Sequence, residues 1–138
     1  MRFWDSSAIV PLVVPQAHTA AAERLLRDDP NIVVWWTSEV ECTAALTRLA
    51  RDGAIHDEQV QLAVTRLSAL LESAIEVDPI SAIREVACRL LRVHPLRSAD
   101  ALQLAAALEV RGPSRNTQFV CFDKRLALAA RREGLSVP

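Results

Sequence analysis

The chain has 138 residues, of which 51% are hydrophobic and 24% are charged, with only 3 glycines and 7 prolines. These proportions exclude a disordered or fibrous protein and predict one globular domain over residues 1–138. The net charge is −1, but the charges are unevenly distributed: residues 1–78 carry 6 basic and 12 acidic side chains, and residues 79–138 carry 10 basic and 5 acidic ones. This uneven distribution fits either a local basic face on the protein or a chance segregation of charges on solvated helices.

The first half of the chain alternates short strand-like runs with helices. We expect a strand over residues 1–5, a helix over 6–12 that Pro15 ends, and a second helix over 16–27. The continuous apolar run over 32–36 is typical of a strand that is buried on both faces. Thr37 or Ser38 then caps a helix that reaches residue 52 and ends at Gly53, and another helix follows over 57–72.

The second half continues the alternation. A brief strand over 74–77 precedes a helix over 81–93 that Pro95 closes, and Ser98 caps a helix over 99–110. A strand over 118–122, a helix over 123–133 and a last short strand over 135–137 follow. This order predicts an α/β fold, with a parallel sheet between helices and any ligand beyond the carboxyl ends of the strands.

Four acidic residues lie at or near those strand ends. Asp5 and Asp123 each end a strand, and Glu41 and Asp100 lie in the first turns of helices. Taken singly, Asp5 and Asp123 fit helix caps, Asp100 fits a complement to the positive end of its helix, and Glu41 fits a solvated helix edge.

Taken together, the four carboxylates meet at one edge of the predicted sheet, which capping alone does not require. Carboxylates that converge repel one another and raise one another's pKa unless a cation joins them. Oxygen ligands without His or Cys suit a hard cation such as Mg²⁺ or Mn²⁺. Such ions are suited to phosphate chemistry because they polarise a phosphoryl oxygen and activate water.

The sequence around these carboxylates resembles the four signature blocks of PIN-domain ribonucleases, and most closely those of VapC-type toxins of bacterial toxin–antitoxin pairs. The blocks run over residues 3–10, 41–48, 96–105 and 122–126, and the resemblance covers essentially the whole chain. The block Leu-Arg-x-x-Asp-Ala-Leu-x-Leu-Ala around Asp100 is the most specific of the four.

The resemblance implies a single PIN-like domain with a five-stranded, mostly parallel sheet flanked by helices, and a homodimer. It also implies an endoribonuclease that depends on Mg²⁺ or Mn²⁺, takes RNA as substrate and is neutralised by a cognate antitoxin. By this resemblance Asp5, Glu41, Asp100 and Asp123 form the catalytic, metal-binding quartet. Asp5 and Asp100 are the main direct ligands, whereas Glu41 and Asp123 act directly or through water. A metal-activated water then cleaves the phosphodiester, leaving 5′-phosphate and 3′-hydroxyl ends.

The sequence departs from the family pattern or leaves it ambiguous at three positions. Cys121 stands where the family often has Thr, and Gln103 stands where His is common. Glu39 competes with Glu41, because Glu39 lies nearer the centre of the apolar helix face; the phrase Glu-x-x-x-Ala-Leu-x-Arg favours Glu41.

Several other residues are weaker candidates. Ser6, Ser7 and Arg97 either contact substrate phosphate or have local roles, the serines as helix caps and Arg97 in an ion pair. The three tryptophans (Trp4, Trp35 and Trp36) are expected in core or dimer packing, and the three histidines (His18, His56 and His94) at the surface or in loops. The cysteines at 42, 88 and 121 lack metal-site or disulfide spacing and read as small core residues of a cytoplasmic protein.

Two alternative functions differ in class from a nuclease. One is a catalytically silent PIN domain that acts as a partner-binding module. The other is a phosphotransfer enzyme such as a haloacid-dehalogenase-like phosphatase, which needs Asp-x-Asp where this chain has Asp5-Ser6-Ser7. No membrane role is expected, because the longest uncharged run, over residues 6–22, is interrupted by prolines and is shorter than the roughly 20 residues of a spanning helix.

Overall fold

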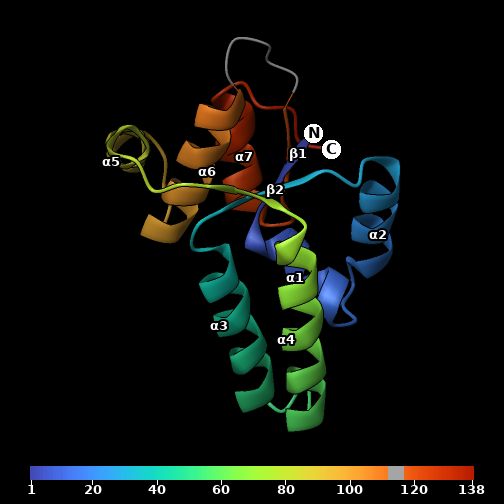
Figure 1. Ribbon diagram of the computed structural model, residues 1–138. Helices are drawn as coiled ribbons and strands as arrows, with labels where there is room; N and C mark the ends of the chain where they lie inside the picture. Colours follow the sequence, from blue (N-terminus) through green and yellow to red (C-terminus); the bar gives the residue numbers. More distant parts are fainter. Residues whose placement is uncertain (112–116) are drawn as a thin grey trace.

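A parallel four-stranded sheet forms the centre of the computed structural model, which describes residues 1–111 and 117–138 (Figure 1). Its strands are β1 (Arg2–Trp4), β2 (Ile32–Trp35), β3 (Ile75–Val77) and β4 (Gln118–Val120), in the order β3-β2-β1-β4. Phe3 of β1 pairs with Val33 on one side and with Phe119 on the other. The strand order reverses beside β1, so the carboxyl ends of β1 and β4 form the switch point at which such sheets bind ligands.

Alternate residues of the strands build two separate cores, one on each face of the sheet. Phe3 and Val33 belong to the core under α5 (Ser81–Val93), α6 (Ser98–Arg111) and α7 (Lys124–Arg132). Trp4 and Val34 belong to the core under α1 (Ser6–Val13), α2 (Thr19–Asp28), α3 (Ser38–Arg51) and α4 (Asp57–Glu72). Figure 1 shows the α3–α4 pair extending away from the sheet. The sheet is therefore covered by helices on both faces, as the alternating sequence pattern predicted.

The sheet has four strands among the described residues instead of the five that were expected. Residues 135–137 form only an isolated bridge, in which Phe119 N donates to Ser136 O at 2.8 Å. The chain reaches this bridge through Gly134, whose φ of +83° turns it sharply out of α7. Leu135 N donates back to Ala130 O, so Leu135 still closes the helix end and the strand does not extend.

The second helix begins at Thr19, three residues later than predicted. The Thr19 hydroxyl accepts a hydrogen bond from Gln16 N and donates one to Pro11 O. These bonds hold residues 16–19 as a turn against α1, and the helix starts only where the turn ends. The bond to Pro11 lies across eight residues, so periodicity in the sequence does not reveal it.

One of the secondary expectations was wrong: Cys88 is exposed on α5 and is not a core residue. Trp4 and Trp35 are in the core as predicted, and the Trp36 side chain, 54% exposed, is open to the dimer packing that was the other expectation. His94 lies in the loop after α5, as predicted, and is buried there with its Nε2 2.7 Å from a carboxylate oxygen of Glu133. None of the described helices combines the length and apolar character that crossing a membrane requires.

Candidate active site

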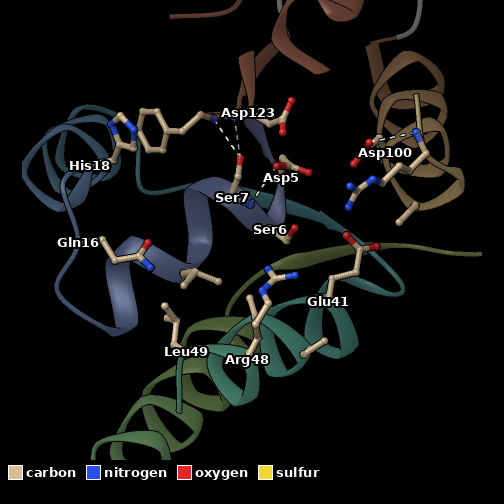
Figure 2. A pocket seen from close by; sticks show the side chains of 16 residues that line it. Asp5, Ser6, Ser7, Gln16, His18, Glu41, Arg48, Leu49, Asp100 and Asp123 are labelled. Atoms are coloured by element: carbon tan, nitrogen blue, oxygen red, sulfur yellow. Dashed lines mark hydrogen bonds between the residues drawn. The ribbon is translucent and has the colours of Figure 1, made fainter. Parts of the chain in front are cut away.

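A cavity of about 530 Å³ opens at the carboxyl edge of the sheet, and all four predicted acidic residues line it (Figure 2). Those residues are Asp5, Glu41, Asp100 and Asp123. Asp5 directly follows β1, and Glu41 and Asp100 lie in the first turns of α3 and α6. Asp123 does not end a strand as predicted, because β4 stops at Val120, and it caps α7 three residues later. The fold therefore brings together carboxylates that are up to 118 positions apart in the chain, from Asp5 to Asp123.

Asp5 directly follows β1, lies beside the end of β4 and is almost fully buried. Its backbone N donates to Val120 O at 3.0 Å, and its side chain caps α1 by accepting from Ser7 N at 2.9 Å. Burial raises the pKa of Asp5 to about 6, and the nearby carboxylates of Glu41 and Asp100 raise it further, whereas the Ser7 hydrogen bonds lower it. The cap interpretation is thus right for Asp5, and the same carboxylate also reaches the cavity.

Asp123 is likewise both a helix cap and a cavity residue. Its Oδ1 accepts from Arg125 N and Leu126 N, each at 2.8 Å, at the start of α7. The Ser7 hydroxyl accepts from Phe122 N at 3.0 Å and from Asp123 N at 3.3 Å. These bonds fasten α1 to the segment after β4, so Ser7 holds Asp123 on the same rim as Asp5.

Glu41 is held in place by two side-chain donors. Its Oε1 accepts from the Thr37 hydroxyl at 2.6 Å, and its Oε2 accepts from Gln103 Nε2 at 3.0 Å. Glu39 is exposed and lines a different depression on α3. The structure therefore brings Glu41, and not Glu39, to the other three carboxylates, as the sequence phrase around Glu41 favoured.

Gln103 is a site residue that the sequence analysis noted only as a departure. It is fully buried, and its Nε2 also donates to the Ser38 hydroxyl at 3.2 Å, which joins α6 to the start of α3. Its Oε1 has no hydrogen-bond partner in the described part of the chain. The sequence did contain a signal for this role, because Gln103 is a long polar side chain inside the apolar stretch from Ala101 to Ala107. An amide that is buried in such a stretch requires hydrogen-bond partners.

Asp100 and Arg97 meet at the first turn of α6. Asp100 Oδ2 accepts from Arg97 N at 3.2 Å, and both residues line the cavity. Within the described ranges Arg97 has no acidic side chain at ion-pair distance. Arg48 of α3 lines the same cavity, and Figure 2 shows it below Ser6 and Glu41. Two guanidinium groups thus border an acidic pocket, which suits a phosphodiester whose charge needs cationic partners.

Cys121 is a buried core residue, as predicted, and Ser6 and Ser7 line the cavity beside it. The Cys121 thiol lies 3.7 Å from Asp5 Oδ2 and 3.6 Å from the Ser7 hydroxyl. Burial, followed by the charge of Asp5, raises the pKa of this thiol, so Cys121 stays a neutral, weak donor. Ser6 lines the cavity without capping α1, because Asp5 supplies the cap.

The donor set fits a hard divalent cation in its chemistry. The four side chains offer only oxygen, and the high pKa of Asp5 reflects uncompensated burial and repulsion that a cation would relieve. In the described residues, no three His, Cys, Asp or Glu side chains are grouped so that they could hold an ion. Joint ligation by the quartet therefore requires the side chains to turn toward one another within the shared cavity.

Comparison with known proteins extends this picture. Residues 2–132 match the family model of the PIN domain. Ribonuclease VapC45 of Mycobacterium tuberculosis is 27% identical over 135 residues, which cover 98% of this chain and 92% of that protein.

Two solved structures share the fold. VapC20 of Mycobacterium tuberculosis, described as a Sarcin-Ricin loop cleaving toxin, aligns with a TM-score of 0.68 at 19% identity, over 94% of this chain and 95% of that one. A toxin–antitoxin complex from Klebsiella pneumoniae aligns with a TM-score of 0.67 at 16% identity, over 92% of this chain and 91% of that one. At these identities the two structures support the fold alone.

Proposed function

Because this chain belongs to the PIN-domain family, we propose that it is an endoribonuclease of the VapC type, dependent on Mg²⁺ or Mn²⁺ and acting as the toxin of a toxin–antitoxin pair. The observation that carries the proposal is that Asp5, Glu41, Asp100 and Asp123 line one and the same cavity at the switch point of the sheet. Fold alone does not fix activity, so the proposal depends on these four side chains.

The proposed roles combine the family resemblance with the place of the four side chains at one cavity. By the resemblance, Asp5 and Asp100 would hold the cation directly, and Glu41 and Asp123 would hold it directly or through water. When bound, the cation polarises a phosphoryl oxygen and lowers the pKa of coordinated water. Arg97, with Arg48, binds the phosphodiester through its guanidinium group. Water adds to the phosphorus, the bond to the 3′ oxygen breaks, and that oxygen takes up a proton, which leaves 5′-phosphate and 3′-hydroxyl ends.

The proposed partners are an RNA substrate, a cognate antitoxin and a second copy of the chain. The toxin–antitoxin complex among the structural neighbours supports the antitoxin. The homodimer follows from the family resemblance, and the exposed side chains of Trp36 and Val40 offer apolar surface for packing.

Cleavage of total RNA by the purified protein tests the proposal. We expect cleavage that requires Mg²⁺ or Mn²⁺, stops with chelator and disappears in the double variant Asp5→Asn, Asp100→Asn. The matched control is Asp52→Asn, Asp78→Asn, which removes two exposed carboxylates outside the cavity and is expected to leave cleavage unchanged. Equal cleavage by the wild type and the cavity variant would point to a contaminating nuclease and contradict the proposal.

The alternative is the catalytically silent, partner-binding PIN domain. It is favoured by the absence, in the described ranges, of three side chains already grouped to hold an ion. No cleavage by the wild type, together with no thermal shift on adding Mn²⁺, would support this alternative.

A further inference from the structure

A second hollow of about 430 Å³ adjoins the carboxylate cavity. This hollow, the apolar lobe, lies between the α1–α2 connection and the α3–α4 connection, and Val14, Pro15 and Ile55 supply part of its wall. Among the described residues, no Asp, Glu, Lys or Arg side chain lines it. It shares the lining residues Gln16, His18 and Leu49 with the carboxylate cavity, so the two hollows adjoin each other.

A stacked pair of aromatic rings stands where the lobe meets the cavity. The rings of His18 and Phe122 are 4.5 Å apart between centroids and only 11° from parallel. Phe122 directly precedes Asp123 in the chain and lines the carboxylate cavity. Figure 2 shows His18 at the far end of the carboxylate cavity from Asp100, with Asp5 and Ser7 between them. The His18 residue is exposed, whereas Phe122 is half-buried behind it.

Hydrogen bonds fix both sides of this pair. Phe122 N donates to the Ser7 hydroxyl, which also holds the backbone of Asp123. The turn that carries His18 is tied to α1 through Thr19, which accepts from Gln16 N and donates to Pro11 O. The stack is therefore a preorganised wall in a fixed relation to the carboxylates.

We propose that the apolar lobe and the His18–Phe122 stack form a nucleobase subsite. The inference rests on the proposed function: with a scissile phosphate at the carboxylates, the neighbouring base is the group that extends into a hollow contiguous with them. An uncharged lobe accepts a flat, largely apolar base, and the outer face of the His18 ring offers it a stacking surface. The occupant is the base of a nucleotide adjacent to the scissile phosphate, and His18 is a binding residue that contributes to base preference.

The test asks whether removing the His18 ring and removing the base that it is proposed to contact have the same effect on cleavage. A single-stranded RNA that the wild type cleaves is prepared with an abasic nucleotide at each position flanking the scissile bond. We expect one abasic position to lower kcat/KM by about tenfold, the scale of base–aromatic stacking. His18→Ala is expected to lower kcat/KM on intact RNA by a similar factor, and the abasic substitution then adds no further loss.

Two variants serve as controls for this coupling. His18→Phe keeps a stacking ring and is expected to retain cleavage. Gln61→Ala changes an exposed position on α4 that lines neither hollow, and is expected to behave as the wild type. Unchanged cleavage by His18→Ala would overturn the proposed subsite. So would a kcat/KM of His18→Ala on the abasic RNA that falls by the product of the two separate losses.

A binding measurement separates this inference from the nuclease proposal. RNA oligonucleotides with 2-aminopurine at successive positions are added in EDTA, and quenching reports stacking of that base. We expect quenching by the wild type and His18→Phe, and its loss in His18→Ala and in Ala54→Phe, which fills the lobe from the exposed Ala54. If this quenching pattern is found and the wild type cleaves no RNA, the proposed base-binding subsite is supported and the proposed nuclease activity is rejected.

Equal quenching by all variants, or none by the wild type, would reject the subsite whether or not RNA is cut. A fall in affinity for a protein partner in His18→Ala, with both RNA measurements unchanged, would assign the lobe to that partner and overturn the proposal.

Discussion

Asp5 is buried without a cationic partner among the described residues, and this sets the pH dependence that we expect. Its pKa is raised from 3.8 to about 6, chiefly by burial and then by Glu41 and Asp100. Between these values the folded state binds more protons than the unfolded state, so the free energy of unfolding falls as pH rises. At neutral pH the charged carboxylate costs about 3 kcal/mol, from about 1.4 kcal/mol per unit of pKa.

The isosteric change Asp5→Asn removes this charge and keeps an oxygen that accepts from Ser7 N. In buffer with EDTA we expect the variant to have a higher Tm than the wild type at pH 7.5, and no such gain at pH 4, where Asp5 is largely protonated. Thermal denaturation at both pH values measures this. A lower Tm of the variant at pH 7.5 would show that the carboxylate is not costly there.

At the scale of elements, α6 and α3 are joined beneath the cavity by one amide. Gln103 Nε2 donates to the Glu41 carboxylate and to the Ser38 hydroxyl, so the position of Glu41 depends on a helix that begins 57 residues after it, at Ser98. The amide fixes the orientation of the Glu41 carboxylate, in the way that hydrogen-bond partners of metal ligands fix the orientation of those ligands.

The change Gln103→Leu keeps the volume and removes both bonds. We expect cleavage to fall by about tenfold or more, the usual effect of losing a partner of a metal-binding group. Stability is expected to change by only about 1 kcal/mol, because the buried, unpartnered Oε1 disappears with the two bonds. Gln103→His supplies a ring donor and should restore cleavage. Parallel measurements of Tm and cleavage rate check this; equal rates for Gln103→Leu and the wild type would contradict it.

The elements that could be predicted well are those whose ends have local causes. The helix over 57–72 begins and ends as predicted because its apolar face repeats with helical period, and the helix over 81–93 stops before Pro95. The helix at Thr19 and the missing strand at Ser136 were mispredicted because distant contacts decide them: the bond of Thr19 to Pro11 O, and a single bridge to Gln118.

At the scale of the whole molecule, the fold joins the two oppositely charged parts of the sequence. Asp5 and Glu41 come from the acidic part, and Asp100 and Asp123 come from the basic part. Their convergence could be predicted because residues at the carboxyl ends of parallel strands share an edge. The role of Gln103 could not be predicted from the sequence, because it depends on which side chains of α6 and α3 face each other in the folded protein.

The arginines at the cavity predict how RNA binding responds to salt. If Arg48 and Arg97 each neutralise one phosphate, replacing either with Ala should lower the slope of log affinity against log salt concentration by about one. Arg84→Ala, on the exposed surface of α5, is the matched control and should leave the slope unchanged. Binding titrations in EDTA over a range of salt concentrations measure the slopes. Identical slopes for all four proteins would exclude phosphate contacts at the cavity.

The pairing of β1 with β4 also has a consequence for biosynthesis. Asp5 precedes Val120 by 115 positions in the chain, but its backbone is fixed by Val120 O, and Ser7 is bonded to the segment that carries Asp123. A ribosome must therefore add residues as far as β4 and Asp123 before the four carboxylates can be assembled. Until then a nascent chain has no complete carboxylate site, so all of the residues between Asp5 and Asp123 are translated before that site can form.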